Sequence, residues 1–346
     1  MKRLEILAAL AFIGASTVAA PTWAAKLHVE NWGTDSPTCG AMAAPCRSIG
    51  KAVALAVGGD TVMVGPGLYS TDLDGDSVLN EPGEEPSFGI VVSVPVTILS
   101  THGASATRIE TVSSASPPQL VNASGGAVFG KRNHGFTIVY APTFCTPIAM
   151  ALEIDGAGSA VAGNVVFVGC PFSTSFGILA SDGAVVRDNR VAALSPSALT
   201  VGIDVDSLAE RNVAIGALDG FNGWGKFRRN IAIENLRGFD LHSAPVAEFT
   251  KNIAVANTSY GIVIDSGATV TGPFSKNSIV NNDVTTNCGL SNQSGTAVLA
   301  TNNFWGASTG PGADPADKVC DSGAGSSTTS TPFLTKPAAP GPGGIQ

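Results

Sequence analysis

An asparagine that returns at a near-constant interval constrains the fold of this chain more than any other feature. It occupies these positions: Asn164, Asn189, Asn212, Asn230, Asn252, Asn277 and Asn302. The steps between them are 25, 23, 18, 22, 25 and 25 residues. A fixed period of about 20 to 30 residues is typical of solenoids, in which each repeat forms one coil.

Short apolar phrases follow the asparagines, such as Ile-Ala-Ile after Asn230 and Ile-Ala-Val after Asn252. Their length and alternation predict short strands, and the Gly, Asn and Asp residues between them predict turns. One coil cannot bury its own apolar face, so stacked coils must share a core. Three strands fit a coil of this length better than a helix and a strand. The 18-residue step predicts either a short coil or a loop at Gly216–Gly225 that replaces one strand.

Three parts of the sequence resemble the right-handed parallel β-helix repeat proteins, the pectate-lyase-like fold. They are the repeat, the segment from Pro45 to Val64, and the phrase Asn-Asn-Phe-Trp-Gly-Ala-Ser-Thr-Gly-Pro that starts at Asn302. That phrase is similar to the last coil of many exported β-helix proteins. The resemblance covers Cys39 to Phe333 and implies an all-β, single-stranded solenoid. Because this fold carries lyases, hydrolases, epimerases, adhesins and inert surface proteins, the resemblance implies a shape rather than an activity.

The expected domain is a right-handed parallel β-helix over residues 25–334, with a flexible Pro/Gly-rich tail at 335–346. Ile49, Val53 and Val57 have helical spacing, and Gly58-Gly59 ends the pattern. We therefore predict an N-terminal capping helix over about residues 46–57, because an uncapped end would expose apolar core and unpaired strand edges.

Residues 1–24 predict a secretory signal peptide. Lys2 and Arg3 give the basic start, Ile6 to Ala20 is apolar, and Thr22-Trp23-Ala24 offers a cleavage site. An uncleaved membrane anchor is the alternative reading, although a spanning helix needs about 20 apolar residues. We expect an exported chain, secreted, periplasmic or on the cell surface, with no stable membrane span after cleavage.

Six cysteines in an exported chain predict three disulfides, and sequence alone allows fifteen pairings. Nearness favours Cys39 with Cys46 and Cys288 with Cys320, which leaves Cys145 with Cys170 about one coil apart. Buried free thiols are the alternative.

An acidic segment begins at Asp72 and carries oxygen ligands at alternate positions, Asp72, Asp74 and Asp76, as a Ca²⁺ loop requires. The pattern departs from an EF-hand loop, because Ser77 stands at its sixth position and Gly83 at its twelfth. The prediction is a calcium site, with a solvated acidic turn as the alternative.

Four glycine phrases, which start at Gly177, Gly202, Gly238 and Gly261, align so that polar residues two and four positions later share one face. The candidate catalytic residues on this face are Asp204, Asp206, Asp240, His242 and Asp265. Nearby Trp224 and Arg237 are candidate substrate-binding residues, one for stacking and one as a cation. Alternate polar residues also occur on any solvated outer face, so the pattern does not by itself require chemistry.

The outer faces of such solenoids form long grooves suited to extended polymers. Carboxylates two positions apart on a strand lie about 6.5 to 7 Å apart, which overlaps the range for inverting glycoside hydrolysis. Alternatively, carboxylates with Ca²⁺ would neutralise a uronic acid while His242 takes a proton, as a lyase requires. The signature phrases Asn-Thr-Asp, Gly-His-Gly and Asp-Pro-His-Asp are absent.

The expected partner is therefore a polysaccharide or a cell-envelope glycan, which the chain binds and in one reading cleaves as a lyase or glycoside hydrolase. A non-catalytic surface, envelope or adhesion protein is the alternative. The net charge of −8 disfavours nucleic acid, because no basic run in the sequence is dense enough to neutralise phosphates.

Overall fold

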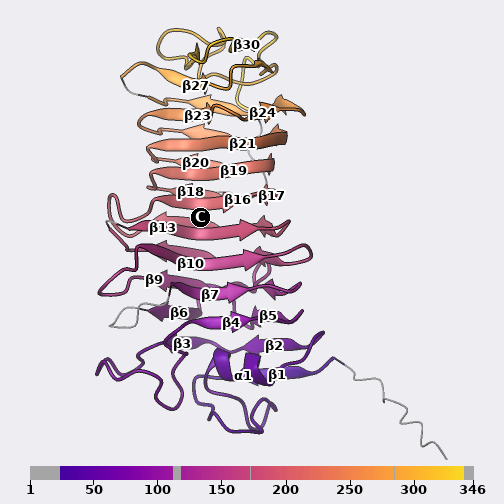
Figure 1. Cartoon of the computed structure of the whole chain (residues 1–346), viewed down its shortest axis with the longest axis vertical. Helices are drawn as coiled ribbons and strands as arrows, with labels where there is room; N and C mark the ends of the chain where they lie inside the picture. The colour runs from indigo at the N-terminus through magenta and orange to yellow at the C-terminus, as the bar shows by residue number, and fades with distance from the viewer. Residues whose placement is uncertain (1–23, 112–117, 172, 284, 339–346) are drawn as a thin grey trace, which may run out of the picture.

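The computed structural model describes residues 24–111, 118–171, 173–283 and 285–338. Within these ranges the chain winds into a stack of coils, with its only described helix near the N-terminal end (Figure 1). The expected signal peptide, apart from Ala24, and the tail beyond residue 338 lie outside the described residues. None of the described helices has the length and hydropathy needed to cross a membrane.

Each regular coil contributes one strand to each of three walls, and all pairings between named strands are parallel. The first wall contains β4 (Ile90–Val92), β7 (Gln119–Ala123), β10 (Ile148–Asp155), β13 (Thr174–Ser181), β16 (Val201–Val205), β19 (Asp219–Arg228), β21 (Arg237–Thr250), β23 (Tyr260–Ile264), β27 (Cys288–Asn292) and β29 (Lys318–Asp321).

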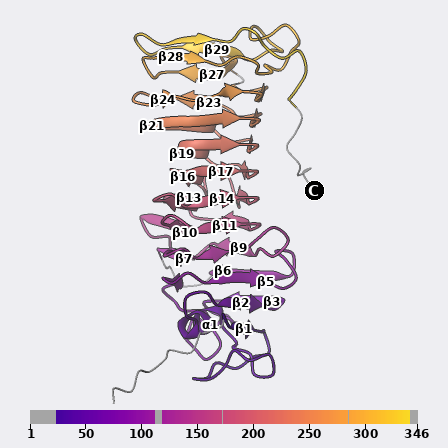
Figure 2. The ribbon, with the colours of Figure 1, turned by 90° about the vertical axis from the view of Figure 1, so that its right-hand side faces the viewer.

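The second wall contains β1 (Lys26–Val29), β2 (Thr61–Val64), β5 (Thr97–Ser100), β8 (Val128–Phe129), β11 (Ala160–Ala162), β14 (Val185–Arg187), β17 (Leu208–Glu210), the later halves of β19 and β21, β24 (Thr269–Val270) and β25 (Phe274–Ser275). The third wall contains β3 (Gly67–Ser70), β6 (Thr107–Thr111), β9 (Thr137–Tyr140), β12 (Val165–Val168), β15 (Arg190–Ala193), β18 (Val213–Ile215), β20 (Ile231–Ile233), β22 (Ile253–Val255) and β26 (Ser278–Val280). A small separate pair, β28 (Ala297–Leu299) with β30 (Ser327–Thr329), lies near the C-terminal end. Figure 2, turned by 90°, shows the coils one above another in chain order, from indigo at the bottom to yellow at the top. The parallel β-helix predicted from the sequence is confirmed.

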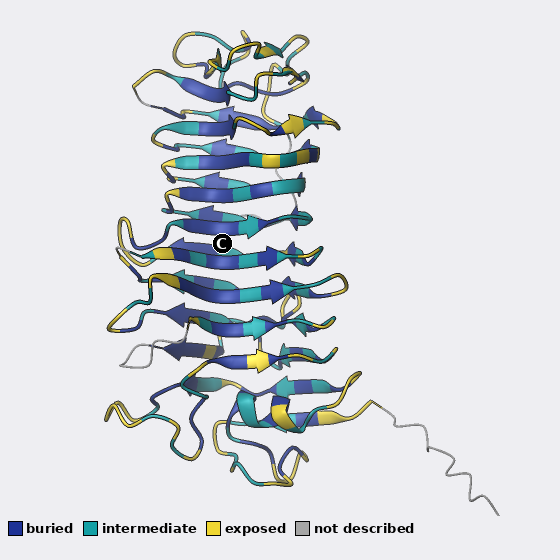
Figure 3. Cartoon of the chain, in the orientation of Figure 1, coloured by how far each residue is buried: buried dark blue, intermediate teal, exposed yellow. Residues whose placement is uncertain are grey.

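The core fills the inside of the stack, because alternate residues of every short strand point inward. In β16 the inward residues Ile203 and Val205 are fully buried, as the glycine-phrase alignment predicts. Aromatic rings stack at the coil spacing, with 4.8 Å between the ring centroids of Phe221 and Phe239. Figure 3 shows the strands mostly buried or intermediate, while exposed residues gather in the loops.

The recurring asparagines form a buried ladder between the second and third walls. The side-chain oxygen of Asn189 accepts hydrogen bonds from the backbone N–H and the side-chain amide of Asn164, at 3.0 and 3.2 Å. The same pair of bonds repeats from Asn189 to Asn212 and from Asn212 to Asn230, and it continues up the stack. Each amide also donates to a backbone carbonyl, so the buried polar groups are satisfied.

The top of this ladder differs from the prediction by one residue. Asn277 donates to Asn303 rather than to Asn302. Asn302 instead holds the left-handed conformation, with φ 56°, that precedes each ladder asparagine in the regular coils. The prediction that Asn302 belongs to the ladder was wrong, because two adjacent asparagines fit the sequence spacing almost equally well.

A second asparagine ladder, absent from the sequence-based prediction, lies where the third wall turns into the first. Asn235 donates to the side-chain oxygen of Asn257, Asn257 to that of Asn282, and Asn282 to the carboxylate of Asp317. All four side chains are buried. Coils with both ladders therefore have two corners fixed by buried side-chain hydrogen bonds.

The short coil of the repeat is confirmed, and the loop alternative is wrong. The 18 residues between Asn212 and Asn230 contain both β18 and β19, so no strand is missing. β19 serves two walls because it bends at Gly223 and Gly225, whose φ angles are 119° and 92°. A Cβ atom at Gly223 would lie 2.0 Å from the Val205 carbonyl oxygen, so only glycine fits this bend.

The helix near the N-terminus is shorter than predicted. α1 spans Ile49–Leu55, because Cys46 still pairs with β1 and Ser48 serves as the N-cap. The helix packs against β1, β2 and β4, near the lower end of the stack in Figure 1. Its role as a cap remains a prediction.

The two disulfides favoured by nearness, Cys39–Cys46 and Cys288–Cys320, are present, and so is the remaining pair, Cys145–Cys170. Cysteines therefore link the first segment, one middle coil pair and the last coils.

Candidate functional site

The predicted catalytic and substrate-binding residues lie on β16, β19 and β21 or directly after β16 and β23, on the outward side of the first wall and at its bend into the second. We call this region the acidic face. Strand pairing places Asp204 beside Asn222, and Asn222 beside Asp240. Asp204 and Asp240 are thus two coils apart, about 9.6 Å between backbones at a strand spacing of 4.8 Å. The extra coil expected between them is β19.

A buried ion-pair cluster lies at one edge of the acidic face. Arg237 binds Asp219 through two parallel contacts, from Nε at 2.5 Å and from a terminal nitrogen at 2.7 Å. The other terminal nitrogen lies 2.6 Å from Asp240. Asp219 and Asp240 are only 4% and 5% exposed. Arg237 is therefore a partner of two protein carboxylates, and not the free substrate cation that the sequence suggested.

The two carboxylates of this cluster differ in how completely their oxygens are hydrogen-bonded. Burial raises the pKa of Asp219, while the hydrogen bonds and charge of Arg237 lower it. Burial also raises the pKa of Asp240, and Arg237 opposes that shift. One oxygen of Asp240, Oδ1, is buried and makes no hydrogen bond. An unpaired carboxylate oxygen of this kind is costly to bury, and functional sites are where such groups collect.

Asp204 has the most perturbed carboxyl group of the acidic face. Burial raises its pKa to about 6; the neighbouring charge of His242 lowers it, and those of Asp206 and Asp219 raise it. A carboxyl group with this pKa is protonated in a large fraction of molecules in mildly acidic solution. It is therefore suited to donate a proton, as a general acid must.

His242 stands at the centre of the acidic face and contacts three neighbours. Its Nε2 atom bonds to the side-chain oxygen of Asn222, and its Nδ1 atom lies 2.9 Å from the Ser243 hydroxyl. The ring of Trp224 meets the imidazole edge-on, with 6.0 Å between centroids. Trp224 is partly exposed, so its ring offers an apolar face next to polar groups, which suits stacking on a sugar ring.

Asp206 and Asp265 lie on the same side of the coils but bond to turns. Asp206 accepts hydrogen bonds from the backbone N–H groups of Asp182 and Gly183 in the preceding coil, at 2.8 and 3.2 Å. Asp265 accepts one from the N–H of Ser266 at 2.7 Å. The carboxylates of Asp206 and Asp265 therefore stabilise the turns next to them.

Sequence reasoning missed Asp219 and Asn222, because the phrase that begins at Gly220 lacks the apolar–Asp alternation used for the alignment. The 18-residue spacing from Asp219 to Arg237, equal to the short asparagine step, was the available signal.

The acidic loop brings its carboxylates together in two groups. Ligand oxygens of Asp72, Asp74 and Asp76 lie within 4.8 Å of one another, as do those of Asp74, Glu81 and Glu84. Backbone N–H groups already bond to several of them; Asp72, for example, accepts from Gly75 at 2.8 Å and Ser77 at 3.1 Å. The charges of Asp76 and its acidic neighbours raise the pKa of Glu81. The donor set is all oxygen and strongly negative, which fits Ca²⁺.

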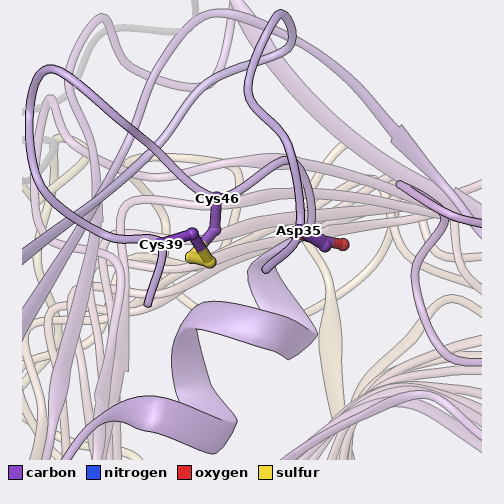
Figure 4. Close-up of side chains that lie close together, drawn as sticks. All are labelled: Asp35, Cys39 and Cys46. Carbon is purple, nitrogen blue, oxygen red and sulfur yellow. A yellow bond between two sulfur atoms is a disulfide. The ribbon is translucent and has the colours of Figure 1, made fainter. Parts of the chain in front are cut away.

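A third group, Asp35 with Cys39 and Cys46, does not fit a metal. The two sulfur atoms are bonded to each other, and the Asp35 carboxylate points away from them (Figure 4). Asp35 instead accepts hydrogen bonds from the backbone of Arg47 and Ser48 and from the Ser48 hydroxyl, just before α1.

No protein-family model matches this chain, and no curated protein matches its sequence. Two solved structures are similar in shape. Pectate lyase Pel9A is 13% identical with a TM-score of 0.46, over 88% of this chain and 78% of its own. A rhamnogalacturonan lyase is 14% identical with a TM-score of 0.36, over 80% of this chain and 75% of its own. The chain's own strand pairing assigns it to the parallel β-helix fold.

Proposed function

We propose that the acidic face binds an extended polysaccharide and hydrolyses it, with Asp204 as the proton donor. The observation that carries this proposal is the Asp204 carboxyl group, whose pKa is raised to about 6 on a face that also carries Trp224 and His242. Asp240 is the second carboxylate. Its backbone lies about 9.6 Å from that of Asp204, just above the roughly 6.5 to 9.5 Å that separates the two carboxyl groups of inverting enzymes.

In this mechanism Asp204 gives its proton to the glycosidic oxygen, and the free oxygen of Asp240 takes a proton from the attacking water. That oxygen is covered in the present arrangement, so a covering side chain has to move before water reaches it. A sugar ring stacked on Trp224 would hold the chain across both carboxylates.

A lyase reaction has less support. It requires a cation that neutralises a uronate carboxylate, and Arg237 is already bound to Asp219 and Asp240. The alternative with its own support is a non-catalytic surface protein, because Asp206, Arg237 and His242 all bond to other protein groups.

The test is a panel of neutral and acidic polysaccharides, assayed for new reducing ends and for the ultraviolet absorbance of unsaturated products. We expect reducing ends without unsaturation, and a kcat/KM that falls as pH rises above about 6, because Asp204 loses its proton there. Asp204→Asn should lower turnover at least about 100-fold. Asp182→Asn, on the exposed turn of the neighbouring coil, is the matched control. Unsaturated products would overturn the hydrolase assignment. No binding or turnover on any polymer would favour the non-catalytic alternative.

We also propose that the loop from Asp72 to Glu84 binds Ca²⁺. Because binding to the folded state alone stabilises it, calcium at about 100 times its Kd would add about 2.7 kcal/mol to the free energy of unfolding. Thermal unfolding in calcium and in chelator measures this. Asp74→Asn should abolish the difference, since Asp74 belongs to both ligand groups, and Asp182→Asn should keep it. If the wild type melts at the same temperature in both buffers, the calcium proposal is wrong and the loop is a solvated acidic turn.

Finally, we propose that the chain is exported. Its three disulfides persist in oxidising compartments and are rare in the cytosol. Cleavage near Ala24, measured by N-terminal sequencing of the mature protein, tests this.

A further inference from the structure

Four basic residues occupy the same turn in four successive coils. They are Arg211, Arg229, Lys251 and Lys276, which we call the basic stripe, and each immediately precedes a ladder asparagine. The ladder bonds fix these turns one above another, so the four backbones lie about 4.8 Å apart along the axis of the stack.

The backbone at these turns does not favour long cations. The residues of the basic stripe have φ angles of 55° to 60°, in the left-handed region that favours Gly, Asn and Asp. The same turn holds such favoured residues elsewhere in the stack, namely Gly163, Asp188 and Asn302. Four consecutive Arg or Lys residues therefore need a cause other than the turn, and their shared property is positive charge.

The acidic partners around the basic stripe are too few to neutralise it. Glu210 alone contacts three guanidinium groups, those of Arg187, Arg211 and Arg229, and Glu248 pairs with Arg228. Lys251 and Lys276 make no ion pair within the described ranges. Seven basic side chains (Arg187, Arg211, Lys226, Arg228, Arg229, Lys251 and Lys276) and three acidic ones (Asp188, Glu210 and Glu248) share this edge. It carries a net charge of +4, although the whole chain carries −8.

A cavity of about 440 Å³ lies along the basic stripe. Four basic residues, two acidic ones and two hydroxyl-bearing ones line it, namely Arg228, Arg229, Lys251, Lys276, Glu210, Glu248, Thr250 and Ser275. Basic side chains are therefore in excess, and no aromatic residue lines the cavity. Lysine is a compact point charge with three donors, and hydroxyl groups add donors and acceptors beside it. The cavity thus offers charge and hydrogen bonds but no surface for stacking bases.

We infer that the basic stripe binds an acidic polysaccharide, a glycan with carboxylate or sulfate groups at regular intervals, laid parallel to the axis of the stack. Cations that repeat at every coil match a polymer whose anions repeat along its length. Nucleic acid fits less well, since single strands rely on aromatic residues for base stacking. The inference goes beyond the proposed function, because the basic stripe lies on a different edge of the coil, and the acidic face repels the same polymer.

Binding is measured by affinity electrophoresis and titration calorimetry, in buffer with chelator. The ligands are alginate, dextran sulfate, neutral dextran and a single-stranded oligodeoxynucleotide. We expect the wild type to bind alginate or dextran sulfate but not neutral dextran. The comparison of alginate with dextran sulfate shows whether the basic stripe prefers carboxylate or sulfate groups. Binding should disappear at about 1 M salt, where the screening length is about 3 Å. The double variant Lys251→Gln, Lys276→Gln should bind about fivefold more weakly, because exposed charge pairs are individually weak.

The matched control is Lys26→Gln, Lys318→Gln, which removes the same charge from two exposed lysines elsewhere. Equal loss in both double variants, no loss in either, or no wild-type binding to an anionic glycan would overturn the inference. So would tighter binding of the oligodeoxynucleotide through the same lysines. Asp204→Asn should leave this binding unchanged, and the lysine variant should leave turnover unchanged, so failure here and failure of the proposed hydrolase activity can be told apart.

Discussion

Replacing Asn230, a ladder asparagine in the middle of the stack, by alanine is expected to destabilise the fold strongly. The Asn230 side chain is fully buried and makes four hydrogen bonds. Its oxygen accepts from the backbone and side-chain N–H groups of Asn212, at 3.0 and 3.1 Å. Its amide donates to the Ala209 carbonyl at 2.9 Å and to the Asn252 oxygen at 3.1 Å.

The four bonds are not equal in cost. In Asn230→Ala the Asn212 amide keeps the Val186 carbonyl, and the Asn252 oxygen keeps the backbone N–H of residue 230. The backbone N–H of Asn212 loses its side-chain acceptor and stays buried. Because each buried group left unpaired costs about 1 to 3 kcal/mol, the expected loss, with the weaker partial losses, is about 2 to 5 kcal/mol.

Urea unfolding followed by circular dichroism and tryptophan fluorescence measures this loss. The matched control is Asn222→Ala, which removes an asparagine side chain from the partly exposed acidic face of the same coil and should cost less than about 1 kcal/mol. A second variant, Asn230→Asp, keeps the acceptor but buries a carboxylate, so it should recover stability as pH falls and the group takes up a proton. Equal unfolding midpoints for Asn230→Ala and Asn222→Ala would refute the claim that the ladder holds the coils together.

Two further predictions concern the buried groups. Glu85 is buried and accepts hydrogen bonds from the backbone of Ile49 and Gly50, and burial raises its pKa from 4.5 to about 7. Its folded pKa lies above its unfolded pKa, so its contribution is fully present below pH 4.5 and is lost as pH rises through 7, by about 3 kcal/mol. Denaturant unfolding from pH 4 to 8 should show this slope in the wild type and a smaller one in Glu85→Gln; equal slopes would contradict the assignment. Phe239→Ala should cost about 3 to 5 kcal/mol, because the ring packs against Phe221 and Phe249 inside the stack. Leu236→Ala, at an exposed position, is its control, and a similar loss in both would show that the aromatic column is not the core.

The regular coils were predictable because each coil needs one buried asparagine at the same corner, and this asparagine recurs in the sequence at a near-constant interval. The period of Asn189, Asn212 and Asn230 already implies the stack, and the alternation around Asp204 and Asp240 already places them outward. The ladder's last position was not predictable, since Asn302 and Asn303 differ by one residue in a spacing that varies by several. Only the backbone conformation, left-handed at Asn302, separates the two.

The candidate site was less predictable than the fold, because sequence gives the side of a strand but not the partner of a side chain. Arg237 looked free for a substrate, and it binds Asp219 from the coil below. The basic stripe was hidden for a related reason. Its members lie 18 to 25 residues apart and form no basic run, although the coils bring them to one edge.

The short coil between Asn212 and Asn230 sets a lower limit on the circumference of this stack. It consists of two strands, two tight corners and one glycine bend, with no residue outside them to remove. A deletion there would pull a corner asparagine out of register with both of its neighbours, whereas added residues can bulge outward from a loop, as they do between β15 and β16. Engineered insertions in the middle of this molecule should therefore be tolerated better than deletions, because its coils have room to lengthen but not to shorten.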